Sequence, residues 1–193
     1  MDQNGIIASL KGQPFLPVVT FQEKDDPVAF MEFLLNKEVA CIEITLRTEA
    51  AWSAFTAIKK AYSDRVAIGA GTVVSEDQIL RLKDLGIDFL VSPGSTPSLI
   101  DAMDASGLAY LPGAATPTEV MHLREKGLRA LKFFPANLYG GLDALKAFGQ
   151  LFPDVQFCPT GGINEQTSSD YLNLKNVFAV GGSWFQKKFS AIK

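Results

Sequence analysis

Several residue types that identify other classes of protein are scarce in this sequence. Its 193 residues include only two cysteines and one histidine, too few for a disulfide framework. No apolar run approaches the about 20 residues that a helix needs to cross a bilayer. The start of the chain lacks a basic leader followed by an apolar block and a cleavage site. We therefore expect a cytoplasmic protein that has no membrane partner.

Charge and length exclude further classes. The formal net charge is −3, and lysine and arginine form no dense block, whereas sequence-independent nucleic-acid binders neutralise phosphates with clustered cations. We expect no nucleic-acid partner and a small-molecule ligand instead. The length suits one domain rather than two, and no linker or low-complexity tract divides the chain. We expect a single domain over residues 1–193.

The cysteines and the histidine show no pattern of a metal or redox site. Cys41 and Cys158 lie far apart in apolar, strand-like runs, which is typical of buried free thiols. His122 falls in a predicted helix, TEVMHLREKG, away from any strand end, and we expect it at the surface. No histidine and carboxylate cluster has metal-ligand spacing, and no G-x-G-x-x-G fingerprint is present. These absences argue against a bound metal and against a nicotinamide cofactor.

Short β-rich runs alternate with amphipathic stretches of helical period, and the pattern repeats roughly every 20 to 26 residues. This alternation indicates parallel βα units. Eight such units predict a (β/α)8 (TIM) barrel, with a doubly wound open sheet as the alternative. In SEDQILRLKDLG, Ser75 can cap a helix and Gly86 can end it. The predicted strands cover residues 15–21, 40–47, 66–73, 88–94, 108–114, 130–136, 155–162 and 177–183.

The end of the sequence leaves little for the last helix of such a barrel. After the eighth predicted strand only WFQKKFSAIK remains, so we expect a short or missing final helix. An incomplete outer ring would leave a gap for a neighbouring subunit to cover.

The second predicted strand carries charges where the barrel interior is expected. In IEITLRT, side-chain alternation places Glu43, Thr45 and Arg47 on one face and the aliphatic residues on the other. A carboxylate and a guanidinium inside a barrel are costly unless they are paired or used. They therefore predict a functional site at the carboxyl ends of the strands, where barrel enzymes carry their active sites. The alternative is an ion pair between Glu43 and Arg47 that only fills the interior.

The sixth predicted strand, ALKFFPA, places Lys132 on the inward face together with Phe134. Burial removes the hydration of an ammonium group and favours the neutral amine, which is the form that attacks a carbonyl carbon. Lys132 is therefore a candidate nucleophile, and Glu43 is the candidate acid–base group. The alternative is a chemically silent ion pair between the two residues.

Glycine turns follow the last two predicted strands, in PTGGI at residues 159–163 and VGGSW at residues 180–184. Glycines let backbone N–H groups approach an anion closely, and the loops after strands seven and eight are the usual phosphate site of this barrel. Thr160 and Ser183 add hydroxyl donors. A lone GG is often only a turn, but two at adjacent strand ends predict a phosphate site.

A further set of residues completes a cradle for a 2-keto acid. Arg47 can bind a carboxylate through two parallel hydrogen bonds, and Thr72, at the end of the strand GAGTV, can donate another. Pro93 follows the next strand and offers an apolar wall, or alternatively only starts a rigid loop. With the carbonyl at Lys132 and a phosphate at the glycine turns, this pattern predicts a phosphorylated keto acid as ligand.

The motifs that carry this site match a known family. IEITLRT, GAGTV, SPG, LPG, KFFPA, CPTGGI and GGSW occur in this order over about 140 residues. In these motifs the chain resembles the 2-keto-3-deoxy-6-phosphogluconate (KDPG) aldolases, which also act as 4-hydroxy-2-oxoglutarate (KHG) aldolases. The resemblance implies a class I (Schiff-base) lyase that uses no cofactor beyond its lysine imine. It also implies a cytoplasmic homotrimer that releases pyruvate in the Entner–Doudoroff pathway.

The resemblance assigns roles by position. Lys132 would form the imine, and Glu43 would move protons. Family members usually have a longer C-terminal helix, and LPGAATPTE differs from the corresponding stretch of many members. The T-L-R of the second strand favours the gluconate type over galactose-configured substrates. The implied pyruvate site comprises Arg47, Thr72, Pro93, Phe134 and Thr160, and the implied phosphate site comprises Gly161, Gly162, Gly182 and Ser183.

Two other functions share part of this pattern. A phosphosugar isomerase or epimerase on the same barrel would use the phosphate turns and would need no interior lysine. A non-catalytic sugar-phosphate-binding protein would keep Lys132 and Glu43 as a silent ion pair. Pyruvate-dependent imine formation separates the aldolase from both.

Overall fold

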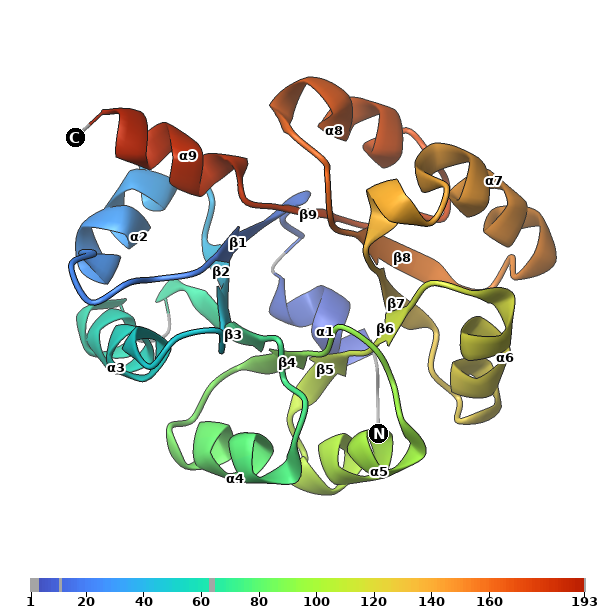
Figure 1. The fold of residues 1–193 in the computed structure, drawn as a ribbon, viewed down its shortest axis with the longest axis horizontal. Helices are drawn as coiled ribbons and strands as arrows, with labels where there is room; N and C mark the ends of the chain where they lie inside the picture. Colours follow the sequence, from blue (N-terminus) through green and yellow to red (C-terminus); the bar gives the residue numbers. More distant parts are fainter. Residues whose placement is uncertain (1–3, 11, 63–64, 193) are drawn as a thin grey trace.

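The computed structural model describes residues 4–10, 12–62 and 65–192. Parallel strands form a ring that helices surround (Figure 1). The strands are β1 (Phe15–Val19), β2 (Cys41–Thr45), β3 (Ala67–Gly71), β4 (Phe89–Val91), β5 (Ala109–Leu111), β6 (Gly113–Ala114), β7 (Ala130–Phe133), β8 (Gln156–Pro159) and β9 (Val180–Gly182). The helices outside the ring are α2 (Pro27–Leu35), α3 (Ala50–Tyr62), α4 (Glu76–Asp84), α5 (Pro97–Ser106), α6 (Pro117–Glu125), η2 (Ala136–Leu138), α7 (Gly141–Leu151), α8 (Glu165–Leu172) and α9 (Trp184–Ala191).

The strand order closes the ring. Six strands pair in the order β5-β4-β3-β2-β1-β9, and β6, β7 and β8 form a second run. A bridge between Thr160 and Gly181 joins the end of β8 to β9. On the other side, β5 and β6 are one strand interrupted at Pro112, which has no N–H group to donate. With these two pieces counted as one, the structure confirms the eight predicted strands and the (β/α)8 barrel, and the open sheet is wrong.

Helix boundaries follow the caps that the sequence supplies. The Ser75 side chain accepts a hydrogen bond from the Gln78 N–H at the start of α4, and Gly86 follows the helix with a φ of +67°. A short or missing final helix was expected, and the structure has a short one, α9. It lies between α8 and α2 in the outer ring (Figure 1). Its Phe189 ring centroid lies 5.2 Å from that of Phe30 in α2. The alternative of a missing helix is therefore wrong.

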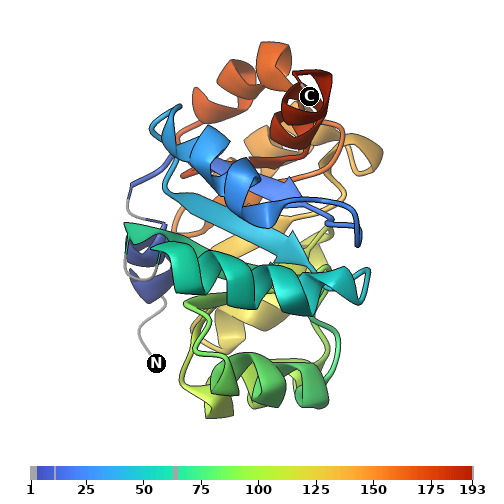
Figure 2. The same cartoon turned by 90° about the vertical axis from the view of Figure 1, so that its left-hand side faces the viewer.

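A helix that the sequence analysis did not predict, α1 (Asn4–Ser9), lies at one end of the barrel. Figure 2 shows it at the end opposite to the arrowheads of the strands. Ile6 and Leu10 are fully buried there. A helix of six residues is too short to be stable by itself, so its burial against the barrel stabilises it. The carboxyl ends of the strands form the opposite face.

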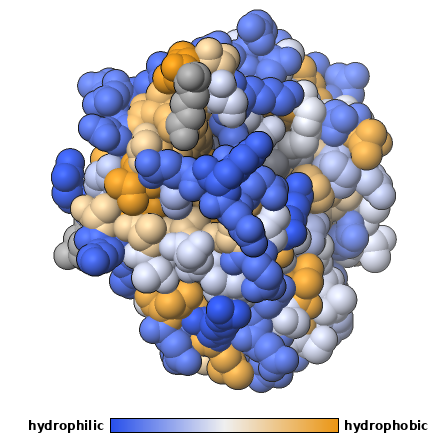
Figure 3. Space-filling view, turned by 60° about the vertical axis from the view of Figure 1, so that its left-hand side comes forward, coloured by the Kyte–Doolittle hydropathy of each residue, from blue (hydrophilic) through white to orange (hydrophobic). Residues whose placement is uncertain are grey.

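The strands separate an apolar outer layer from a partly polar interior. Ile42, Ile44 and Phe133 face the helices and are fully buried, whereas Glu43 and Lys132 are buried on the inward side. On the outside, Figure 3 shows hydrophilic side chains mixed with smaller hydrophobic areas. Within the described ranges, none of the helices combines the length and the apolar character that crossing a bilayer requires.

Candidate active site

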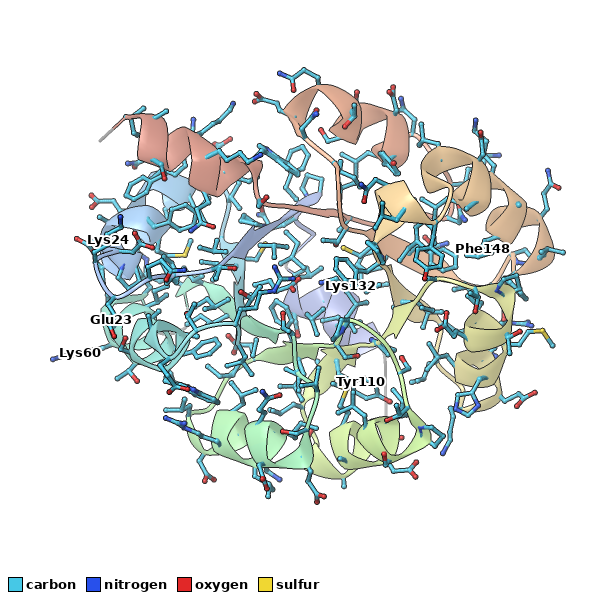
Figure 4. The ribbon with its side chains drawn as sticks, viewed as in Figure 1. Glu23, Lys24, Lys60, Tyr110, Lys132 and Phe148 are labelled. Carbon is cyan, nitrogen blue, oxygen red and sulfur yellow. The ribbon has the colours of Figure 1, made fainter. Side chains whose placement is uncertain are left out.

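A lysine and a glutamate from strands on opposite sides of the ring meet inside the barrel. The Nζ atom of Lys132, in β7, lies 2.9 Å from Oε1 and 3.2 Å from Oε2 of Glu43, in β2. The two side chains are only 6% and 1% exposed, so the contact is shielded from solvent. Figure 4 shows Lys132 within the ring of strands. Strand alternation thus gave the correct inward direction for both side chains.

The pair has two proton arrangements with different chemistry. With the proton on Lys132, an ammonium group donates to both carboxylate oxygens of Glu43. With the proton on Glu43, a neutral amine lies beside a carboxylic acid. Burial disfavours the charged arrangement and mutual attraction favours it, and the short N–O distance lets the proton pass between the groups. The pair can therefore supply a nucleophile and a general acid at one point.

The two cysteines belong to the barrel interior and are poor nucleophiles there. Both are free and buried, as predicted. Burial raises the pKa of the Cys158 thiol to about 12, and burial raises the pKa of the Cys41 thiol to about 12 as well. With these pKa values, both thiols remain protonated near neutral pH. They are poor nucleophiles because the thiolate is the reactive form. Cys158 pairs in register with Lys132, so the thiol and the amine belong to the same part of the interior.

A cavity of about 140 Å³ opens at the carboxyl ends of the strands. At about 30 Å³ for each water-sized atom, it has room for the heavy atoms of one phosphate group. Phe134 connects the cavity to the lysine, because its ring centroid lies 5.3 Å from Lys132 Nζ. Seven predicted site residues line the cavity together with two that were not predicted. The lining consists of Arg47, Phe134, Thr160, Gly161, Gly162, Gly182 and Ser183, with Val18 and Ile163.

Backbone and packing explain why glycine occurs in these turns. Gly161 and Gly162 have φ angles of +107° and +71°, which other residues rarely adopt. At Gly182, an added Cβ would overlap the Trp184 ring, so this glycine also lets α9 pack closely. Thr160 is 5% exposed, and its hydroxyl lies against Gly181, where an added Cβ would overlap it. The same hydroxyl interacts with the Cys158 thiol.

Of the five residues predicted for the keto-acid end, Arg47, Phe134 and Thr160 line the cavity, and Thr72 and Pro93 do not belong to its lining. Arg47 is exposed, and it lines the cavity together with the glycine turns. Thr72 follows β3 with a φ of +60°, uncommon for a residue with a side chain. The backbone of Pro93 fills the space beside Gly113, which pairs in register with Lys132. Pro93 therefore borders the lysine strand, while Arg47 belongs to the glycine side.

A hydrogen-bonded group that was not predicted lies next to the site. The hydroxyl oxygens of Thr20 and Thr45 are 2.7 Å apart. The Gln186 side chain of α9 accepts a hydrogen bond from the Thr20 N–H, at 3.2 Å, and donates one to the Thr20 carbonyl, at 2.8 Å. Thr45 shares the inward face of Glu43, which was a visible signal. The partners of Thr20 depend on the barrel closing, which no local pattern indicates.

The expectation that His122 lies at the surface is wrong. It is half-buried on α6 rather than exposed, and its Nε2 atom is buried without a hydrogen-bond partner in the part of the chain that the structure describes. The helix packs this side of its ring against the neighbouring structure, which helical periodicity alone did not reveal. Across the described ranges, no three histidine, cysteine or carboxylate side chains gather as ligands for a metal ion.

Fold and site together define a class of protein. It is a (β/α)8 barrel whose interior holds a lysine–carboxylate pair beside an anion-sized cavity at the carboxyl ends of the strands. A family model for KDPG and KHG aldolases matches residues 6–193. The chain therefore belongs to the KDPG and KHG aldolase family.

Individual relatives agree with this membership. The 2-dehydro-3-deoxy-phosphogluconate aldolase of Pseudoalteromonas atlantica is 40% identical over 171 residues, which cover 89% of this chain and 79% of that protein. The KHG/KDPG aldolase of Escherichia coli K12 is 39% identical over 171 residues, which cover 89% of this chain and 80% of that protein.

Solved structures of the family have the same fold. The KDPG aldolase of Legionella pneumophila, with pyruvate captured as a covalent carbinolamine intermediate, has a TM-score of 0.89 and 35% identity, over 98% of this chain and 93% of that one. The enzyme of Zymomonas mobilis with 3-phosphoglycerate has a TM-score of 0.90 and 36% identity, over 95% of this chain and 87% of that one.

Proposed function

We propose that this protein is a class I aldolase that cleaves KDPG into pyruvate and glyceraldehyde 3-phosphate through an imine on Lys132. The observation that carries the proposal is the buried contact of 2.9 Å between Lys132 Nζ and Glu43 Oε1. An aldolase of this class needs a neutral amine and a nearby proton carrier in a site shielded from water. No cofactor enters the proposed reaction, because the lysine itself forms the covalent intermediate.

In the first half of the reaction, the neutral amine of Lys132 attacks the C2 carbonyl carbon of the keto acid. The nitrogen loses a proton and the carbonyl oxygen gains one, which gives a neutral carbinolamine. Glu43, as a carboxylic acid, then gives its proton to the departing hydroxyl group. Water leaves, and an iminium ion remains on Lys132. Glu43 lies within the distance that a general acid requires.

In the second half, the iminium ion withdraws the electron pair of the C3–C4 bond. As this bond breaks, Glu43, now a carboxylate, takes the proton of the C4 hydroxyl group, directly or through a water molecule, and the aldehyde leaves. Protonation of the remaining enamine at C3 restores an iminium ion. Its hydrolysis releases pyruvate and returns the free amine.

The proposed binding mode divides the substrate along the carboxyl ends of the strands. Arg47 and Thr72 bind the carboxylate, and Pro93 and Phe134 form walls at the reacting carbon. The phosphate occupies the cavity of about 140 Å³, where the glycine turns present backbone N–H groups. The exposed Arg47 lines that cavity, so it can attract the phosphate as well as the carboxylate of the substrate. Thr160 lines the keto-acid part of the site, and Gly161, Gly162, Gly182 and Ser183 form the phosphate end.

KHG, which would give pyruvate and glyoxylate, is a second proposed substrate. The supporting observation is that Arg47 lines the cavity and has no ion-pair partner within the described residues. It is thus available to a carboxylate in place of the phosphate. The relative in E. coli carries both activities in its name. An isomerase, an epimerase or a silent sugar-phosphate-binding protein would leave the lysine unmodified.

We further propose that the chain acts as one domain in a cytoplasmic homotrimer of the Entner–Doudoroff pathway. This proposal rests on the family to which the chain belongs. Sedimentation at several protein concentrations tests the assembly, and a mass of one or two chains would contradict it. A coupled assay for pyruvate release from KDPG and from KHG tests the substrates.

Covalent trapping tests the chemistry. Borohydride added with pyruvate should inactivate the protein and add the mass of reduced pyruvate to the peptide that contains Lys132. A Lys132→Met variant should form no adduct, whereas Lys146→Met, which changes an exposed lysine on α7, should react like the parent. Trapping at another lysine would contradict the role of Lys132, and no trapping at all would favour the isomerase or binding alternatives.

A further inference from the structure

Strand β3 contributes two glycines to the barrel interior, and each one leaves room for a side chain from a neighbouring strand. Gly69 and Gly71 lie on the same face of β3 as Glu43 does on β2, because Glu43 pairs in register with Gly69. A Cβ added at Gly69 would overlap the ring of Phe89. A Cβ added at Gly71 would overlap the carboxylate of Glu43. The two positions therefore hold different side chains.

The overlap at Gly71 involves the functional part of Glu43. An added Cβ would meet Oε1 and would lie 2.7 Å from Cγ and 2.8 Å from Cδ, both closer than non-bonded carbon atoms approach. The same Oε1 atom lies 2.9 Å from Lys132 Nζ. Within the described residues, the hydrogen bonds of this carboxylate are those with Lys132. The missing side chain at Gly71 thus provides the space in which the carboxylate contacts the amine.

Space, rather than backbone conformation, requires glycine at this position. The φ angle of Gly71 is not in the left-handed region, unlike those of Gly161 and Gly162. Its carbonyl accepts the Leu46 N–H at 2.9 Å, an ordinary contact between β2 and β3. Alanine can adopt this extended backbone. A methyl group would therefore act on the Glu43 side chain, which is flexible at its end, more than on the strand.

We infer that Gly71 is a positioning residue: it creates the niche that directs the Glu43 carboxylate at Lys132. The inference deepens the proposed function and rests on it, because it assumes that Glu43 carries protons for the lysine. A methyl group at position 71 displaces the carboxylate, breaks the contact with the amine and slows each proton transfer. Substrate binding is affected less, because alanine can adopt the extended backbone of position 71 and so leaves the next residue, Thr72, in place.

A double-substitution cycle separates this role from a general packing effect. Glu43→Ala removes Cγ, Cδ and both oxygens, which are the atoms that a methyl group at position 71 would meet. Glu43→Ala alone should lower kcat about 100-fold or more, the usual contribution of a general acid–base group. Gly71→Ala alone should lower kcat at least about tenfold, with a smaller change in KM. In the Glu43→Ala background, Gly71→Ala should change kcat by less than about twofold.

The rate of borohydride trapping with pyruvate supplies a second measurement. The trapping rate should fall in Gly71→Ala. In the Glu43→Ala background, Gly71→Ala should leave the trapping rate nearly unchanged. Gly69→Ala is the matched control on the same strand and face, because its methyl group meets Phe89 instead. Its effects on kcat and on the thermal midpoint should be equal in the two backgrounds at position 43. Equal effects of Gly71→Ala in both backgrounds would overturn the inference.

Folding and function can be judged separately. If Gly71→Ala fails to fold, recovery of its thermal midpoint in the Glu43→Ala background supports the inference, and failure in both backgrounds overturns it. If Glu43→Ala keeps the parent kcat, the proton-carrier role in the proposed function is lost. In that case, the thermal midpoint of Gly71→Ala is compared in the parent and in the Glu43→Ala background. A loss of stability in the parent background alone shows that the niche is built around the carboxylate.

Discussion

Burial acts differently on the amine and on the thiols that share the barrel interior. Lys132 has the Glu43 carboxylate at 2.9 Å, so a proton can leave the amine without leaving the pair. Within the described residues, the Cys41 thiol donates its hydrogen bond to a backbone carbonyl, that of Phe15 at 3.2 Å, which accepts the bond and cannot take the proton. Burial therefore keeps both thiols protonated, whereas the amine contacts a carboxylate.

The thiols give a prediction at this scale. Burial raises the pKa of both Cys41 and Cys158 to about 12, so at pH 8 only about one folded thiol in ten thousand is a thiolate. Iodoacetamide should label the folded protein far more slowly than the protein in denaturant, where both cysteines react. Rapid labelling of the folded chain would contradict the burial of the thiols.

Titration of the same thiols contributes to alkaline unfolding. Their pKa is higher in the folded chain than the ordinary value of 9.0, so between pH 9 and 12 the unfolded chain has released protons that the folded chain still holds. Proton release favours unfolding, and the free energy of unfolding should fall with rising pH over that range. Below pH 9 the thiols should add no pH dependence.

Helix α9 is connected directly to the wall of the cavity. Gln186 forms two hydrogen bonds with the backbone of Thr20 at the end of β1, and Phe189 packs against Phe30 and Phe33 of α2 at 5.2 and 5.4 Å. Its first residue, Trp184, occupies the space beside Gly182 in the cavity wall. This short helix therefore holds together one side of the cavity.

We predict that Gln186→Ala lowers the free energy of unfolding by about 1 to 2 kcal/mol, since two hydrogen bonds are lost and two backbone groups remain partly buried. Chemical denaturation monitored by circular dichroism measures the change. Lys187→Ala is the control, because its side chain is exposed on the same helix and a surface substitution should change stability by less than about 0.5 kcal/mol. Equal losses in the two variants would contradict the anchoring role of Gln186.

At the scale of the whole molecule, the site joins distant parts of the chain. The cavity lining runs from Val18 in β1 to Ser183, the residue before α9, and the two residues of the lysine–glutamate pair are 89 positions apart in the sequence. A bound ligand would link these segments in the folded state alone. Binding should therefore raise stability through mass action.

This linkage predicts the effect of 3-phosphoglycerate on thermal unfolding. At a concentration of about 100 times its Kd, the ligand should add about 2.7 kcal/mol to the free energy of unfolding, which differential scanning calorimetry would register as a higher midpoint. Glycerate, which lacks the phosphate, is the control and should have a much smaller effect. Equal shifts with both compounds would contradict a phosphate site at the glycine turns.

The architecture was predictable because it rests on local repetition. Strand-like runs at regular spacing gave eight βα units, and alternation in IEITLRT and ALKFFPA gave the inward direction of Glu43 and Lys132. Two features were missed for a common reason. The helix α1 is stabilised only by burial of Ile6 and Leu10 in the finished barrel, and the partial burial of His122 depends on how α6 packs.

By itself, the sequence determined the order of strands and helices, which face of each strand is polar, and the two glycine turns, because these follow from side-chain alternation, helical period and backbone freedom. Only the tertiary structure decided which of the polar residues meet. The contact of Glu43 with Lys132, the grouping of Arg47 with the glycine turns, and the niche at Gly71 arise from closing the ring. Ring closure sets the distances between strands on opposite sides, and no local pattern contains those distances.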